Sequence, residues 1–161
     1  MYSKNQIITA LEQIPDPEIP VISIVELGVI RDVIFKDKTI EVVLTPTYSG
    51  CPAMKQMEDD VRAKLVELGF ETIVLSIVYN PPWTTDWLSP EAKLKLQKYG
   101  IAPPEESTTD KSFLTGKIKN ITCPHCKSTD SVMVSQFGST ACKALYKCNN
   151  CLEAFDYFKC I

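Results

Sequence analysis

Apolar residues recur at helical spacing in two stretches of the first hundred positions. In residues 3–13, Ser3 can cap a helix because Gln6 occupies the capping-box position, and apolar side chains then form one face. Between residues 54 and 68 the apolar side chains lie three or four positions apart, and Gly69 follows them as a stop signal. We therefore expect two amphipathic helices.

Alternating apolar positions predict three strands around the second helix. Residues 29–45 contain two β-rich runs that flank a polar turn at 35–38, which predicts a hairpin. Residues 72–79 supply a third strand, and the intervening helix then forms a crossover that lies on one face of the sheet. This pattern predicts a small two-layer α/β sandwich with a mixed three-stranded sheet.

A third helix and a linker are expected next. Ser89 is a suitable N-cap, Pro90 suits the first turn, and Gly100 can end the helix. The following stretch is rich in Pro, Glu, Ser and Thr. We expect a first domain at 1–100, a linker at 101–116 and a small β-rich domain at 117–161.

The small domain contains two Cys-x-x-Cys pairs with the spacing of a zinc ribbon. The four cysteines are Cys123, Cys126, Cys148 and Cys151. Two such turns on a hairpin can form a tetrahedral thiolate cage for zinc. Four protein ligands leave no position for water or substrate, so we interpret the site as structural zinc. His125 lies between the first pair and is expected to be exposed or to support the site.

Other interpretations of these thiols remain open. They could be buried apolar residues or a disulfide pair, and two Cys-x-x-Cys turns can also hold one redox iron, as in a rubredoxin-like electron-transfer protein. Cys142 and Cys160 lie outside the four-ligand set and are expected to be buried spectators, although a ribbon with extra thiols could bind a cluster instead.

Composition and charge exclude several classes of protein. No apolar stretch approaches the roughly 20 residues that span a bilayer, and the first residues show no signal-peptide pattern, so we expect a cytoplasmic protein without a membrane partner. The net charge of −3 argues against nucleic acid as the partner. Residues 111–161 nevertheless carry a net charge of +4 before thiolates are counted, or about +2 with four thiolates on one zinc, which favours docking to an acidic protein surface.

The loop at residues 45–52 is the candidate for chemistry in the first domain. Pro52 suits a first helical position, so Cys51 would be the N-cap and its sulfur would lie where the helix dipole favours a thiolate. Such a thiolate could bind iron or act as a nucleophile, and an inert half-buried cysteine is the alternative. Trp83 and Trp87 could anchor a partner or could instead cover the edge of the core.

Four segments of the chain resemble a known family. They are Asp16-Pro17-Glu18-Ile19-Pro20, Glu26-Leu27-Gly28, the loop Thr45–Pro52, and Asn80-Pro81-Pro82-Trp83-Thr84. Together they resemble the SufT-type metal-sulfur cluster assembly domain. With the ribbon segment at 137–148, the whole chain resembles the PaaD family of the phenylacetyl-CoA epoxidase system.

This resemblance implies an accessory protein of aerobic phenylacetate degradation. Its implied partners are the phenylacetyl-CoA epoxidase subunits and an iron-sulfur reductase, and its implied task is maturation of their metal centres. The reactive cysteine of the family maps onto Cys51, and the acidic motif maps onto Asp16 and Glu18. Cys51 would then hold iron or a cluster transiently, with a carboxylate nearby; alternatively, Asp16 only bonds backbone amides of its own loop.

Three functional classes remain open. The chain could be a maturation factor, a structural or regulatory docking component of the epoxidase, or an enzyme. A single histidine, no phosphate-binding glycine loop and no Ser-His-Asp set argue against independent catalysis. The oligomeric state is open too, because the edge of a three-stranded sheet needs cover or a partner, which a second copy could provide.

Overall fold

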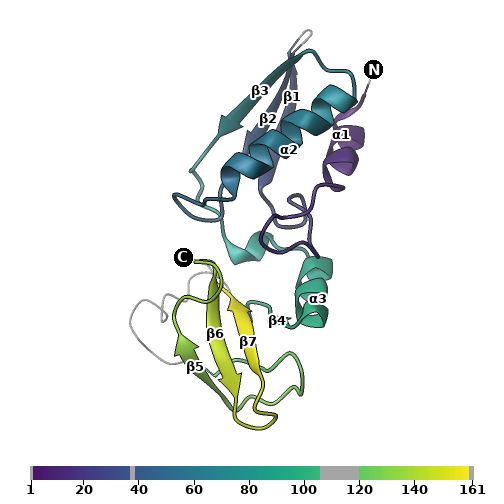
Figure 1. The fold of residues 1–161 in the computed structure, drawn as a ribbon. Coiled ribbons are helices and arrows are strands. Elements are labelled where there is room, and N and C mark those ends of the chain that lie inside the picture. Colours follow the sequence, from purple (N-terminus) through teal and green to yellow (C-terminus); the bar gives the residue numbers. More distant parts are fainter. Residues whose placement is uncertain (1, 37–38, 106–119, 160–161) are drawn as a thin grey trace. The chain divides into compact units, whose positions relative to one another are not determined.

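The structure is a computed structural model that describes residues 2–36, 39–105 and 120–159. Its contacts divide the chain into two compact units, residues 1–83 and 84–161, which we call the N-terminal unit and the ribbon unit. Each unit is built on one β-sheet (Figure 1). No helix among the described residues is long and apolar enough to cross a membrane.

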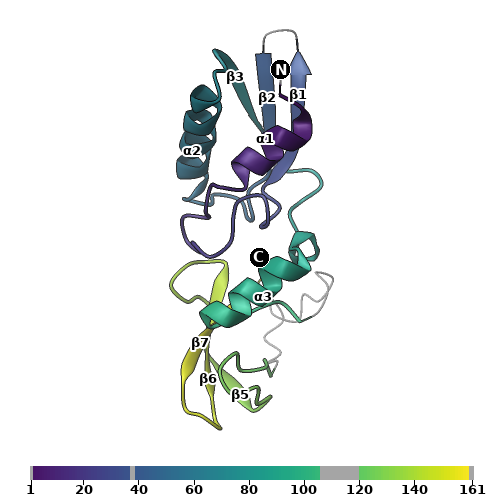
Figure 2. The same ribbon diagram turned by 90° about the vertical axis from the view of Figure 1, so that its right-hand side faces the viewer.

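The N-terminal unit is a two-layer α/β sandwich. Its elements are α1 (Lys4–Leu11), β1 (Ile30–Lys36), β2 (Thr39–Leu44), α2 (Met54–Glu67) and β3 (Thr72–Ile77). The sheet order is β1-β2-β3, with an antiparallel β1–β2 hairpin (Figure 2) and a parallel β2–β3 pair. Helices α1 and α2 contact each other and pack on β1 and β3, respectively. The predicted fold class, a mixed three-stranded sheet with helices on one face, is confirmed.

Local signals in the sequence explain where the helices begin and end. At α1 the Ser3 hydroxyl accepts the Gln6 N–H at 3.3 Å and the Ser3 N–H donates to Gln6 Oε1 at 2.8 Å, which completes the predicted capping box. Past the end of α2, Gly69 adopts a φ of 90°, a left-handed conformation that glycine takes without strain.

The core of this unit lies between the central strand and the helices. Strand β2 buries Ile40, Val42 and Leu44 completely, whereas the residues between them are only half-buried. The helices face them with apolar side chains that are at most 2 % exposed, namely Ile7, Leu11, Met57, Val61 and Leu65. This one-sided burial is the outcome that the alternation in β2 predicts.

The ribbon unit is a four-stranded sheet preceded by a helix. Its elements are η1 (Thr85–Trp87), α3 (Pro90–Tyr99), β4 (Ile101–Ala102), β5 (Ser131–Ser135), β6 (Lys143–Cys148) and β7 (Ala154–Phe158). The sheet order is β4-β7-β6-β5. Helix α3 has the predicted limits, because Ser89 Oγ accepts the Ala92 N–H at 3.0 Å and Gly100 ends the helix at a φ of 92°.

Strand β4 comes from the stretch that the sequence suggests as a linker. Ile101 and Ala102 are 4 % and 1 % exposed and pair in parallel with β7, so this part of the chain belongs to the ribbon sheet. Residues 106–116 of the predicted linker lie outside the described residues. The domain limits at 100 and 117 therefore stay a prediction.

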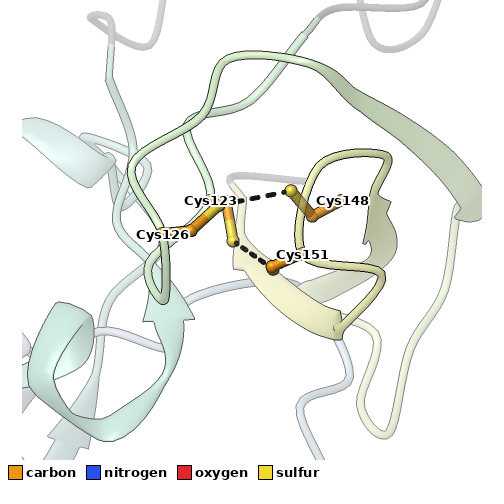
Figure 3. Close-up of side chains that lie close together, drawn as sticks. All are labelled: Cys123, Cys126, Cys148 and Cys151. Carbon is orange, nitrogen blue, oxygen red and sulfur yellow. Dashed lines mark hydrogen bonds between the residues drawn. The ribbon is translucent and has the colours of Figure 1, made fainter.

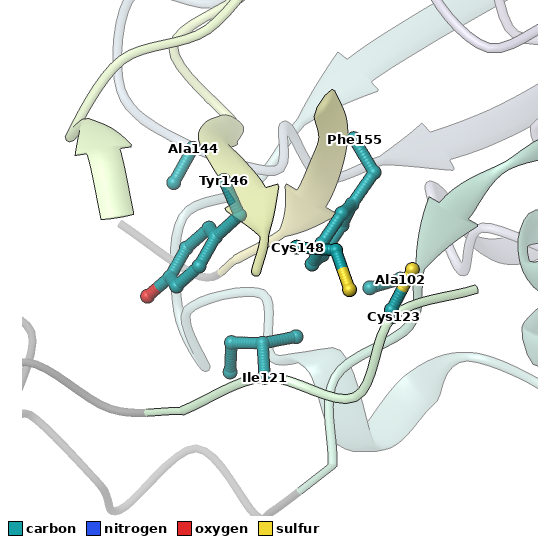
Figure 4. Packing of buried hydrophobic residues seen from close by; sticks show 7 residues of the cluster. All are labelled: Ala102, Ile121, Cys123, Ala144, Tyr146, Cys148 and Phe155. Carbon is teal, nitrogen blue, oxygen red and sulfur yellow. The ribbon is translucent and has the colours of Figure 1, made fainter. Parts of the chain in front are cut away.

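Two of the metal-site cysteines help to form the small core of the ribbon unit (Figure 4). Cys123 and Cys148 are fully buried beside Ile121, and the rings of Tyr146 and Phe155 stack with their centroids 5.9 Å apart. A core of this size buries little apolar surface. We therefore expect the fold of the unit to depend on a metal ion bound by the cysteines.

Candidate functional site

The two Cys-x-x-Cys turns of the ribbon have the same backbone geometry. In each turn the first cysteine donates its N–H to the carbonyl five residues later, Cys123 to Ser128 and Cys148 to Glu153, both at 2.9 Å. The residue after the second cysteine has a positive φ, 66° at Lys127 and 65° at Leu152. Non-glycine residues rarely adopt this conformation, so the sequence does not predict it.

These turns bring all four cysteine sulfurs to one point (Figure 3). The four Sγ atoms lie within 4.8 Å of one another, with Cys123 and Cys151 separated by 3.8 Å and Cys126 and Cys148 by 3.5 Å. Among the described residues this is the only group of three or more potential ligands that could hold a metal ion.

The sulfur separations fit one tetrahedral ion. A Zn–S bond of about 2.3 Å places the sulfurs of a tetrahedron roughly 3.8 Å apart, close to the separations above. A cluster of several metal ions would hold its thiolates further apart. The donor set is closed and half-buried, which suits a structural ion, and a single iron would have the same geometry.

The surroundings of two of the four sulfurs shift their pKa values in opposite directions. The backbone N–H of Ser128 and the side chain of Asn150 lower the pKa of Cys126 to about 6. At Cys151 the backbone N–H of Glu153 acts in the same direction, but burial and the three neighbouring thiols together outweigh it and raise the pKa to about 12. A bound divalent ion would displace the protons that remain on these thiols.

Cys51 lies before α2 rather than at its N-cap. Helix α2 begins at Met54 with Ala53 as the preceding cap residue, so the expected N-cap position of Cys51 is wrong by two residues. The thiol still accepts the backbone N–H of Ala53 and the hydroxyl of Thr47. The sequence does not indicate Thr47 as a partner of Cys51, because only the fold of the loop brings its hydroxyl to the sulfur.

The environment of Cys51 favours the thiol and not the expected thiolate. The side chain is only 9 % exposed, and this burial is the largest cause of its raised pKa. The negative charges of Glu18 and Asp16 raise the pKa further, and burial and these charges together outweigh the two hydrogen bonds to the sulfur. Both carboxylates therefore lie within electrostatic range of Cys51, a proximity that the sequence could not establish.

Asp16 has a structural role in its own loop as well. Its side chain is 3 % exposed, and Oδ1 accepts the N–H groups of Glu18 at 2.9 Å and Ile19 at 2.7 Å. This is the backbone-bonding alternative weighed for Asp16, and it coexists with the proximity to Cys51. Cys51, Asp16 and Glu18 do not converge into a metal-ligand group like that of the ribbon.

Trp83, Trp87 and Cys142, which the sequence also singles out, are buried or half-buried. Trp83 is 3 % exposed and its indole N–H donates to the Leu27 carbonyl at 2.8 Å, which agrees with core cover and not with an exposed anchor. Trp87 is half-buried in η1. Cys142 is buried with its Sγ 3.0 Å from the Thr140 hydroxyl, and Cys160 lies outside the described residues.

We expect the two polar neighbours of Cys51 to shift its pKa in opposite directions. Glu18→Gln removes a negative charge and should lower the pKa of the thiol, whereas Thr47→Val removes a hydrogen-bond donor and should raise it. The pH dependence of iodoacetamide labelling, followed on the Cys51 peptide by mass spectrometry, measures both. Parallel shifts in the same direction, or none, would contradict this description of the site.

Comparison with known proteins identifies both halves of the chain. Residues 107–159 match the PaaD zinc beta ribbon domain, and residues 4–74 match the iron-sulfur cluster assembly protein family. A protein of Escherichia coli K12, provisionally named as a subunit of 1,2-phenylacetyl-CoA epoxidase, is 43 % identical over 98 % of this chain and 93 % of its own length. The chain belongs to the PaaD family.

Relatives of the N-terminal unit point to metal-cluster maturation. The Bacillus subtilis protein YitW, named as an Fe-S protein maturation auxiliary factor, is 40 % identical over 58 % of this PaaD-family chain and 92 % of its own length. A crystal structure of a DUF59 domain from Bacillus anthracis is similar with a TM-score of 0.54 and 32 % identity, over 58 % of this chain and 90 % of that one.

The family match and the positions of the four sulfurs both indicate a zinc ribbon. A PaaD zinc ribbon matches the segment, and its four cysteines fit a structural zinc ion. The zinc would order the ribbon unit rather than react, because its shell is closed by protein ligands. Any cargo chemistry must then involve residues outside this quartet.

Proposed function

We propose that the N-terminal unit carries iron or an iron-sulfur cluster transiently on Cys51 for the metalloproteins of the phenylacetyl-CoA epoxidase system. The observation that supports this most is that Glu18 and Asp16 lie close enough to Cys51 for their charges to raise the pKa of its thiol. All three lie within the part of the chain that matches the iron-sulfur cluster assembly family. The E. coli relative, named as an epoxidase subunit, supports the choice of client.

The chemistry of the loop suits a carrier better than a resident site. A single thiol that keeps its proton at neutral pH binds a soft ion only when the ion displaces that proton. Two nearby carboxylates attract the cation but do not close a shell with the sulfur. An incomplete donor set holds cargo less tightly than a complete one, so a client with more thiolates can remove it.

A docking role is the second candidate, since the E. coli relative is named as a component of the epoxidase. In that case the chain would remain bound to the epoxidase or its reductase and would carry no cargo. A stable stoichiometric complex with purified epoxidase, without any change in the metal content of the partner, would favour this alternative.

Cargo delivery in cells tests the proposal. The epoxidase and its iron-sulfur reductase are produced in cells that contain wild-type chain, Cys51→Ser or no chain, and iron and labile sulfide are measured per purified partner. We expect Cys51→Ser to reduce the content to that of cells without the chain. Cys142→Ser, another buried thiol outside the quartet, is the matched control and should behave as wild type. Full metal content with Cys51→Ser would end the carrier hypothesis.

A further inference from the structure

Within the described residues, strand β3 is an edge strand whose own sequence lacks the usual protective residues. It lies at one end of the β1-β2-β3 order (Figure 1), and its sequence, Thr-Ile-Val-Leu-Ser-Ile, has no charge and no proline. Proteins usually protect such an edge with lysine, proline or a bulge. The opposite edge, β1, has charged residues and a pairing irregularity between Ile30 and Asp32.

The side chains of β3 are less buried than its composition predicts. None of its six residues is buried, whereas the adjacent β2 buries every second residue. Val74 and Ile77 are 42 % and 37 % exposed, and Ile73 and Leu75 are half-buried although they lie in register with the buried Ile40 and Val42. Helix α2 therefore covers this strand incompletely.

The backbone N–H and C=O groups of β3 point alternately toward β2 and toward the outer edge of the sheet. The Val78 N–H donates to the Leu44 carbonyl of β2 at 2.8 Å, so residues of the same parity face β2. Ile73, Leu75 and Ile77 then face outward. Arg62 on α2 donates from Nη1 to the Ile73 carbonyl at 3.3 Å. This agrees with an Ile73 carbonyl that does not pair with β2.

We infer that β3 is a homodimer interface, at which two copies of this chain pair antiparallel through their β3 edges and form one continuous sheet. A two-fold axis at Leu75 places Leu75 opposite its own copy and Ile73 opposite the second copy's Ile77. These are the residues whose N–H and C=O groups face outward. Each pair can exchange two hydrogen bonds once Arg62 releases or shares the Ile73 carbonyl.

The strand is complementary to itself in this register. Apolar side chains meet on the helix side of the sheet, while Val74 meets the second copy's Ser76 on the other side. No like charges oppose each other within the strand, because it contains none. Such an isologous contact closes on itself and needs no other partner. A foreign apolar strand is the competing occupant, and the test separates the two.

Sedimentation velocity of the full chain over a range of concentrations is the first test. We expect a reversible dimer for wild type and a clear shift toward monomer for Val74→Lys, which puts a charge into the pairing register. Val66→Lys, on α2 and 59 % exposed, is the matched control and should dimerise as wild type does. A monomer at all concentrations would overturn the inference and would leave a foreign strand as the occupant.

Amide exchange in the unmodified chain decides the register even if a variant fails to fold. The N–H groups of Ile73, Leu75 and Ile77 should become protected as concentration rises, whereas those of Val74 and Ser76, which face β2, should not change. Dimerisation without this alternation would place the interface elsewhere and would contradict the inference.

Discussion

Replacing Cys148 with serine should remove zinc and unfold the ribbon unit. Cys148 is fully buried in the small ribbon core and supplies one of the four sulfurs, so the substitution opens both the ligand shell and the packing. Structural zinc contributes on the order of 10–16 kcal/mol to folding in zinc-finger peptides, far more than a core of this size can replace. We therefore expect loss of the cooperative unfolding transition of residues 120–159.

The measurement is zinc per chain by native mass spectrometry, with the dispersion of ribbon amide resonances by NMR. Resonances of the N-terminal unit should stay dispersed, because its core contains none of the four cysteines. Cys142→Ser is the control, since Cys142 is as buried as a core residue but is not a ligand, and it should keep one zinc per chain. A folded, zinc-bound Cys148→Ser chain would contradict a structural role for the ion.

Asp16 holds its own loop by hydrogen bonds and also raises the pKa of Cys51, and two substitutions separate these two effects. Asp16→Ala leaves the buried N–H of Ile19 and the N–H of Glu18 without their acceptor, and we expect it to destabilise the N-terminal unit by about 2–4 kcal/mol. Asp16→Asn keeps an acceptor oxygen and should cost much less. Denaturant unfolding followed on the N-terminal unit measures both free energies.

The same pair of variants tests the proximity of Asp16 to the thiol. Asp16→Asn removes a negative charge that raises the pKa of Cys51, so Cys51 should ionise at lower pH in this variant. Equal destabilisation by both substitutions, with an unchanged Cys51 titration, would contradict the description of the loop.

Local sequence signals accounted for most elements of the fold. The capping residues Ser3 and Ser89 and the glycines at 69 and 100 act within one helical turn, so they can be recognised without tertiary context. Strand β4 could not be predicted, because two residues are too short to show a period. Its place in the ribbon sheet depends on pairing with β7, which is more than fifty residues away.

The candidate sites were predictable in part for a similar reason. Cysteine spacing identified the ribbon quartet, since the ligands of each turn are close in sequence. The ionisation of Cys51 was predicted in the wrong direction. Its helix-terminus position suggested a thiolate, but burial and the carboxylates of Glu18 and Asp16, all tertiary effects, decide the pKa.

Metal and labile-sulfide analysis of chain purified without oxygen tests the central claim most directly. We predict one zinc per chain in wild type and in Cys51→Ser, and its loss in Cys123→Ser. Iron or sulfide above the zinc should be present in wild type and absent in Cys51→Ser. Zinc alone in every sample with an intact Cys51 would contradict the carrier function and favour a docking role.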